Sequence, residues 1–287
     1  MQYVDELMGL ETNFDIIHRV IRLGDTDACM YLIDGFCKDE LMQKILQYLM
    51  DLKAEDFPKH EMSKIAIPYV EVDLDDTWEK ILGALLSGVF VLLLDGYEKA
   101  VLIDARTYPT RGVEEPDKDK VLRGSKDGFV ETVVFNTALI RRRIRSTDLH
   151  MEMLNAGENS RTDIVLCYME SRVDPKLLTQ IRERIRSIQV DALAMNQESL
   201  AECLYQRKWY NPFPKFKYTE RPDTAAAQVL EGNLVILVDN SPSAMILPTT
   251  IFDVVEEADD YYFPPVTGTY LRLTRFLIAL ITLLLTP

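Results

Sequence analysis

The sequence predicts an α/β protein: two tandem, duplicated α/β subdomains with small mixed sheets, followed by the start of a transmembrane helix. Three observations predict it: an internal repeat without gaps, a strand-to-helix segment that opens each half, and an apolar run at the C-terminal end of the sequence. The expected boundaries are 1–108 for the first subdomain, 109–150 for a linker and an arginine-rich helix, 151–262 for the second subdomain, and 263–287 for a juxtamembrane segment and a truncated first transmembrane helix.

The internal repeat aligns "SGVFVLLLDGYEKAVLID" (87–104) with "EGNLVILVDNSPSAMILP" (231–248) at a constant shift of 144 positions. Gly88 falls on Gly232, and each copy continues with an apolar run, a turn dipeptide and a second apolar run. Glycine commonly ends a helix, and a tight turn between apolar runs is typical of an antiparallel hairpin. Each half is therefore expected to contain a helix, a buried strand and an antiparallel partner strand.

The similarity extends upstream of both glycines. "DDTWEKILGALLSG" predicts a helix with Asp75 or Asp76 as its N-cap, and "RPDTAAAQVLEG" predicts a helix that starts at Pro222. Alternating apolar residues predict a strand before each helix. These residues are Ile65, Ile67 and Tyr69 in one copy, and Phe216 and Tyr218 in the other.

A strand followed by a helix opens each half, over 29–49 and over 164–185. In the second copy the pair Asp174-Pro175 marks the start of the helix. Between the halves, "DGFVETVVFNTALIRRRI" is expected to be helical from near Asp127. The predicted unit is β-α followed by β-α-β-β, present twice.

The charge balance argues against nucleic-acid binding, because the formal net charge is −14. Residues 1–105 carry most of it, with 9 Lys and Arg against 21 Asp and Glu, a net of −12. The four cysteines form no C-x-x-C pair and accompany no histidine cluster, which favours reduced thiols and neither zinc nor disulfides. The acidic N-terminal sequence lacks the layout of a secretory signal.

No catalytic motif stands out. The three histidines are scattered, and the phosphate-binding and nucleophile-elbow patterns are missing from the sequence. We expect no catalytic residue, no metal site and no cofactor. The turns Asp34-Gly35 and Asp95-Gly96 follow apolar strands, where α/β proteins often bind ligands, although most such pairs are plain turns.

The most conspicuous basic feature is the cluster Arg141, Arg142, Arg143 and Arg145. Successive residues point in different directions around a helix, so these arginines do not form one flat track. They form either a solvated helix face that complements the helix dipole, or a docking surface. A docking surface would meet the acidic first subdomain, a neighbouring protomer or anionic lipid headgroups, and pairing within or between subunits is favoured over lipid.

The C-terminal run 276–285 is apolar apart from Thr282, with Arg272 and Arg275 immediately upstream. It is shorter than the roughly 20 residues that span a bilayer. It is either a final core helix or the first part of a span, and the missing polar face favours the span. Tyr270 and the aromatic residues at 261–263 would then lie at the interface, and the arginines predict that the preceding region faces the cytoplasm.

Three motifs in the right order resemble a known family: "PDKDKVLRGSKDGFVETVVFNTALIRRRI" (116–144), "YTERPD" (218–223) and "GTYLRLTRF" (268–276). They are similar to those of the A subunits of GerA-type bacterial spore germinant receptors, and the resemblance covers essentially the whole chain. Nutrient-receptor members usually read "RGPREGF" where this chain has "RGSKDGF" (123–129). This departure, with "GVEEPDKDK" (112–120), resembles a branch of the family in which direct nutrient recognition is in doubt.

The resemblance implies two α/β subdomains ahead of several membrane spans, in a protein of the forespore inner membrane. This region would face the cytoplasm, form a homo-oligomer, bind other membrane subunits of a germination complex, and support ion or dipicolinate release. The alternative is a nutrient-sensing module with a ligand cleft between the subdomains. The residues assigned to subunit or subdomain docking are Arg123, Asp127, Asn136, Arg141, Arg142, Arg143 and Arg221. Arg272 and Arg275 are assigned to the membrane-proximal segment.

Overall fold

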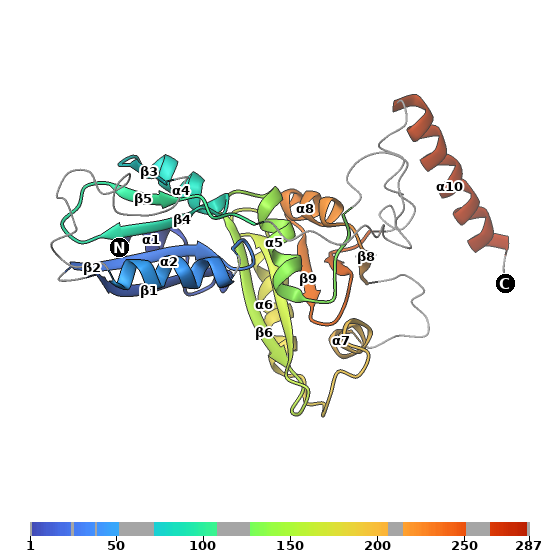
Figure 1. Ribbon diagram of the computed structural model, residues 1–287. Coiled ribbons are helices and arrows are strands. Elements are labelled where there is room, and N and C mark those ends of the chain that lie inside the picture. The colour runs from blue at the N-terminus through green and yellow to red at the C-terminus, as the bar shows by residue number, and fades with distance from the viewer. Residues whose placement is uncertain are drawn as a thin grey trace. The chain divides into compact units, whose positions relative to one another are not determined.

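Figure 1 shows the computed structural model, which describes residues 2–23, 26–37, 39–51, 72–107, 127–205, 215–250 and 265–285. The chain forms two compact units. One comprises Met1–Thr110 with Val134–Met153, and the other comprises Arg111–Val133 with Leu154–Pro287. The strand β6 (Leu149–Ala156) belongs to the second sheet, but its first residues, Leu149–Met153, are part of the first unit.

The first unit is built on a five-stranded sheet with the order β1-β2-β4-β5-β3. Its strands are β1 (Ile16–Leu23), β2 (Thr26–Ile33), β3 (Val72–Asp75), β4 (Phe90–Leu94) and β5 (Ala100–Ile103). Its helices are α1 (Gln2–Leu7), α2 (Asp39–Asp51), α4 (Trp78–Leu86) and α5 (Val133–Arg143). One face of the sheet packs against α2, and the other packs against α1, α4 and Ala138 of α5. The sheet is therefore buried on both faces.

The second unit repeats this plan, with the strand order β6-β7-β9-β10-β8. Its strands are β6 (Leu149–Ala156), β7 (Thr162–Met169), β8 (Lys217–Thr219), β9 (Leu234–Val238) and β10 (Ala244–Leu247). Its helices are α6 (Pro175–Arg186), α7 (Gln197–Leu204), α8 (Pro222–Glu231) and α10 (Pro265–Leu285). Residues of α6 and α7 pack on one face of the sheet.

The matching strand orders confirm the predicted duplication, but the sheets are not mixed. Each strand pair whose register is described is antiparallel, including β2 with β4 and β7 with β9. The prediction of mixed sheets is therefore wrong, because strands β2 and β4 are antiparallel although a helix, α2, lies between them in the chain. The strands β1 and β6 were also missed, and each adds a fifth strand as the hairpin partner of the strand that opens its half.

The repeated glycines have the backbone conformation that the pattern predicts. Gly88 has φ +95° and Gly232 has φ +98°, each directly after or at the end of a helix. The turns between the paired strands also use left-handed residues, with φ +79° at Gly96 and +58° at Asn240. Glycine and asparagine reach this region at low cost, so the 144-residue repeat reflects a shared backbone path.

Helix starts agree with the sequence in two cases and differ in two, and α8 begins at Pro222 as predicted. Asp174 caps α6 as predicted, because its side chain accepts a hydrogen bond from the backbone N–H of Lys176 at 2.9 Å. The N-cap of α4 is Thr77 in place of Asp75 or Asp76, since Asp75 accepts from the N–H of Thr77 at 2.8 Å in the turn before the helix. Helix α5 begins at Val133, six residues after Asp127. The predicted strand residues 65–69 lie outside the described residues.

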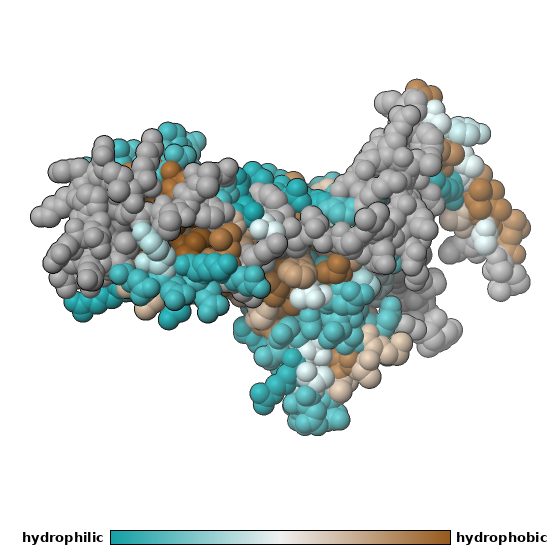
Figure 2. All heavy atoms as spheres, in the orientation of Figure 1, coloured by the Kyte–Doolittle hydropathy of each residue, from teal (hydrophilic) through white to brown (hydrophobic). Residues whose placement is uncertain are grey.

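Helix α10 contains the whole apolar run and carries large apolar side chains that are exposed. Figure 2 shows brown, hydrophobic spheres along α10. The large side chains that are exposed on this helix are Val266, Tyr270, Leu273, Leu277, Ile278, Leu280, Ile281 and Leu285. Among the described residues, no helix combines the length and hydropathy that crossing a membrane requires. Residues 261–263, the other predicted interfacial aromatics, are outside the described part of the chain.

Candidate docking site around Arg141

Arg141 lies in the last turn of α5, and its side chain is completely buried in the first unit. Its guanidinium holds the carboxylate of Asp15, the residue just before β1, in a two-pronged ion pair. Nε donates to Oδ2 at 2.7 Å and Nη2 donates to Oδ1 at 3.0 Å. The Asp15 side chain is only 2% exposed. Such paired, parallel hydrogen bonds between charged groups are among the stronger and more directional polar contacts in proteins.

The third guanidinium nitrogen of Arg141 binds the backbone that follows α5. Nη1 donates to the carbonyl oxygen of Leu149 at 3.1 Å and to that of Ser146 at 3.3 Å. One side chain therefore links the end of α5, the start of β1 and the start of β6. The guanidinium has five N–H donors, and all three of its nitrogens donate in the hydrogen bonds to Asp15, Ser146 and Leu149.

The segment before β1 is fastened by a second buried polar residue, Asn13. Its Nδ2 donates to the carbonyl of Met8 at 2.8 Å, and its Oδ1 accepts from the N–H of Met151 at 2.7 Å. The backbone of Asp15 also accepts from the N–H of Asp34 at 2.8 Å. Because both side-chain ends of Asn13 are paired, this buried network meets the requirement that polar groups in an interior be satisfied.

The other arginines of the cluster do not share this environment. Arg142 is exposed, and Arg143 is half-buried and donates from Nη1 to the carbonyl oxygen of Leu139 at 2.8 Å. The last contact satisfies a carbonyl at the C-terminal end of α5, where a cation is also favoured by the helix dipole. The four arginines thus face different surroundings, since Arg141 is buried, Arg143 is half-buried, and Arg142 and Arg145 are exposed.

Arg221 is a buried arginine of the second unit, just before α8. Its Nε and Nη2 donate to the two carboxylate oxygens of Asp223 at 3.0 and 2.5 Å, and its backbone N–H donates to Oγ1 of Thr219 at 3.1 Å. The Asp223 side chain is 32% exposed, so this pair reaches the surface of the unit. Its place, between the end of β8 and the first turn of α8, fixes the entry to the helix.

The remaining predicted docking residues are spread over the chain. Asn136 is fully buried on α5, and Asp127 is half-buried in the non-helical segment before that helix. Arg123 is outside the described residues. Asp127 and Arg221 belong to the second unit, whereas Asn136 and the arginines of α5 belong to the first. Asp15 and Asn13, which complete the network of Arg141, were missed, because a single Asp among many acidic residues carries no signal in the sequence.

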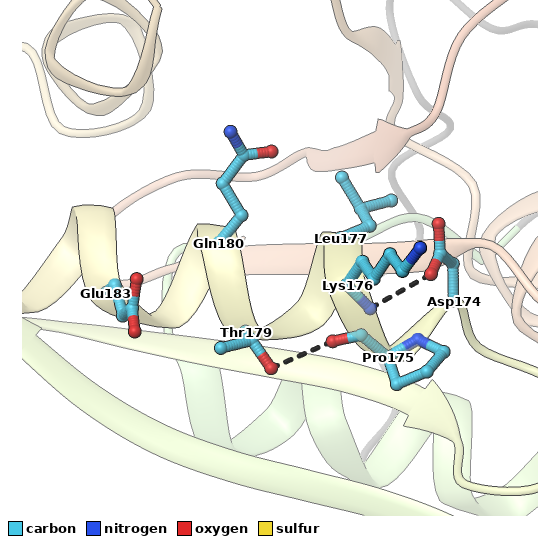
Figure 3. Close-up of a pocket in the computed structure, with 7 residues that line it drawn as sticks. All are labelled: Asp174, Pro175, Lys176, Leu177, Thr179, Gln180 and Glu183. Carbon is cyan, nitrogen blue, oxygen red and sulfur yellow. Dashed lines mark hydrogen bonds between the residues drawn. The ribbon is translucent and has the colours of Figure 1, made fainter.

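A shallow hollow lies along the first half of α6 in the second unit (Figure 3). It is lined by Asp174, Pro175, Lys176, Leu177, Thr179, Gln180 and Glu183. The polar groups in it serve the helix itself: Asp174 caps it, and the Thr179 hydroxyl donates to the carbonyl of Pro175 at 2.8 Å. Nothing in this arrangement selects a ligand.

Two of the thiols, those of Cys29 and Cys203, are poorly suited to nucleophilic chemistry. Burial raises the pKa of the Cys29 thiol, and burial with a smaller contribution from Glu202 raises the pKa of the Cys203 thiol. A raised pKa lowers the fraction of reactive thiolate. The pKa of Tyr31 is raised as well, first by burial, and its hydroxyl donates to Oδ1 of Asp5 at 2.8 Å. Within the described ranges, no three His, Cys, Asp or Glu side chains are grouped as metal ligands would be.

Comparison with known proteins identifies relatives over the whole chain. A family model described as Bacillus/Clostridium GerA spore germination protein matches residues 2–287. Stage V sporulation protein AF of Bacillus subtilis (strain 168) is 38% identical over 289 residues, covering 100% of this chain and 58% of the relative. Spore germination protein KA of the same organism is 27% identical, covering 94% of this chain and 50% of the relative. The chain spans about half the length of these relatives.

A solved structure shares the fold. It is the crystal structure of the N-terminal domain of the A subunit of the Bacillus megaterium spore germinant receptor GerK3. The TM-score is 0.60 at 27% sequence identity, over 87% of this chain and 93% of that chain. The duplicated α/β architecture described above is therefore that of an N-terminal domain already seen in a germinant receptor subunit.

Proposed function

The chain belongs to the GerA family of Bacillus and Clostridium spore germination proteins, and on that premise we propose that it is the N-terminal assembly and gating region of a spore inner-membrane germination protein. The observation that carries the proposal is the match of the family model to residues 2–287. The proposed role is not enzymatic: the region joins copies of the protein and partner subunits, and so supports the release of ions or dipicolinate during germination.

Two features of the structure support an assembly role. Helices pack on both faces of the first sheet and on at least one face of the second, and in the first unit the buried network of Arg141 and Asp15 ties three segments together. Each unit is expected to move as a rigid body when a partner displaces it, because a close-packed interior deforms little. We propose that exposed charged groups such as Arg142 contact partner subunits.

Helix α10 is the proposed route from this region to the membrane. Arg272 and Arg275 precede its apolar residues, and cations of this kind favour the cytoplasmic side of a span. We place the region on the core side of the spore inner membrane for this reason. If the assembly has two arrangements, a change from one to the other would act through α10 on the membrane part. It would favour one conformation of that part when the two arrangements interact with it with different free energies.

The experiment that tests the proposal compares self-association with ligand binding on the 287-residue chain. Sedimentation velocity over a hundredfold range of concentration is expected to reveal oligomers that increase with concentration. A thermal-shift screen against amino acids, sugars and dipicolinate is expected to give no shift. A reproducible ligand-dependent shift in a chain that stays monomeric would contradict the assembly role and support a sensing module instead.

A further inference from the structure

Among the described residues, the first sheet ends in two strands that each have one neighbouring strand, β1 and β3 (Figure 1). The N–H of Asp34, the residue after β2, donates to the carbonyl of Asp15, the residue before β1. In this register every second residue after Asp15, starting with Ile17, directs its backbone hydrogen bonds to β2. In an antiparallel pair the intervening residues direct their backbone groups away from the partner. His18, Val20 and Arg22 therefore present their backbone N–H and carbonyl groups at the outer edge. Among the described residues, no strand lies beside β1 there.

The two edges carry opposite charges. On β1, His18, Arg19 and Arg22 are exposed, within a half of the chain that is otherwise strongly acidic. On β3, Asp73 is exposed and Asp75 is partly exposed. Asp75 already pairs with Lys80 at 3.1 Å, whereas the part of the chain that is described holds no side-chain partner for Arg19, Arg22 or Asp73.

Four of these charged residues, His18, Arg22, Asp73 and Asp75, lie on one face of the sheet, whereas Arg19 lies on the face that packs against α2. Val72 and Leu74 pack into the cluster with α2, so Asp73 and Asp75 point to the opposite face. His18 is paired in register with Tyr31, which packs on that opposite face, and Arg22 follows four residues later on the same side. A second copy beside this sheet would thus bring opposite charges together on one face.

Strand direction decides which edges can meet with their faces aligned. The four steps from β1 to β3 are all antiparallel, so β1 and β3 run in the same direction. A translated copy therefore places its β3 parallel to β1. Two other arrangements have aligned faces, each with a rotated copy: β1 against β1 brings basic residues together, and β3 against β3 brings acidic residues together. Like charges across neighbouring strands are destabilising.

We propose that the first sheet joins copies of this chain head to tail, with the basic edge β1 of one copy beside the acidic edge β3 of the next. The inference deepens the proposed function and rests on it, since it names the surface through which the assembly region self-associates. A contact between two different surfaces is heterologous and closes into a ring or continues as a filament. Charged residues on edge strands can also prevent sheets from pairing edge to edge. That role is best served by the same sign on both edges, whereas the opposite signs on β1 and β3 attract each other.

The test uses charge reversal on the 287-residue chain, with sedimentation velocity as the readout. Arg19→Glu with Arg22→Glu makes the β1 edge acidic, so that both edges are acidic. Asp73→Lys replaces the exposed acidic residue of the β3 edge with a basic one, so that both edges carry exposed basic residues. Each variant alone is expected to self-associate about tenfold more weakly than the unmodified chain, following the usual size of cross-strand charge effects. Mixing the two variants is expected to restore association, because each supplies the edge that the other has lost.

The control is Lys44→Glu with Lys176→Glu, which makes the same charge change at exposed positions on α2 and α6. It is expected to leave association unchanged, and circular dichroism should show the same unfolding transition for all variants. Oligomers that persist in both edge variants would overturn the edge contact and leave the proposed assembly role standing. Loss of association in the β1 variant alone would also overturn it, in favour of a β1–β1 contact or of another acidic partner. A chain that stays monomeric throughout would contradict both.

Discussion

Replacing Arg141 with methionine is expected to lower the free energy of unfolding of the first unit by about 3–5 kcal/mol. The substitution leaves the carboxylate of Asp15, which is only 2% exposed, without the guanidinium that holds both its oxygens. It also removes the donor to the carbonyls of Ser146 and Leu149. Urea unfolding monitored by circular dichroism measures the loss, and hydrogen exchange at β1 and α5 locates it.

The matched control is Arg142→Met, one residue further along the same helix. Arg142 is exposed, so the expected change is within about 0.5 kcal/mol. A second comparison replaces both members of the pair, Asp15→Leu with Arg141→Met. It is expected to be more stable than the Arg141→Met variant, because no buried charge is left uncompensated. Equal stabilities for Arg141→Met and Arg142→Met would show that the buried ion pair does not hold the unit together.

Replacing Gly88 with alanine is expected to destabilise the first unit by about 3 kcal/mol, from a left-handed backbone and from overpacking. Gly88 has φ +95°, and an added Cβ would lie 2.3 Å from Cδ2 of Phe36, whose side chain is fully buried and has no room to withdraw. The change is measured by the same urea unfolding experiment.

Gly83→Ala is the control for this prediction. Gly83 lies inside α4, and an added Cβ would meet nothing within 4 Å. Since alanine favours a helix over glycine, this variant is expected to gain about 0.5–1 kcal/mol. The prediction fails if both alanine variants change stability in the same direction.

The sequence revealed the fold wherever the information was local. The constant shift of 144 positions placed Gly88 over Gly232, and both adopt the same left-handed conformation at a helix end. Asp174 before Pro175 marked the start of α6 in the same way. Such features depend on a few neighbouring residues, whose conformational preferences are strong enough to be visible in one chain.

What depends on distant segments was not visible. Arg141 and Asp15 are 126 positions apart, and no property of either residue alone indicates the other. The strand order had the same limit: apolar runs mark β2 and β4 as buried strands, but their antiparallel pairing follows from how the segments pack. The start of α5 was misplaced because the N–H of Phe129 donates to the carbonyl of Glu220, which holds the segment before the helix out of helical conformation.

The family was recognisable from three short motifs, and the whole-chain match confirms it. The branch suggested by residues 123–129 agrees with the 38% identity to stage V sporulation protein AF. The docking roles assigned to Arg123, Asp127, Asn136 and Arg221 stay predictions. For Arg141 the structure shows a contact within its own unit, and its neighbours Arg142 and Arg143 remain the candidates for contacts with other subunits.

The most direct test of the assembly role is the mass of the full-length protein proposed to carry this region and its membrane spans, reconstituted in lipid membranes and measured by mass photometry. The account predicts a discrete oligomer that is lost when residues 1–262 are deleted and retained when the exposed control residues Lys44 and Lys176 are reversed. A protein that is strictly monomeric in the membrane, or an oligomer of unchanged mass after the deletion, would contradict the claim that this region drives assembly.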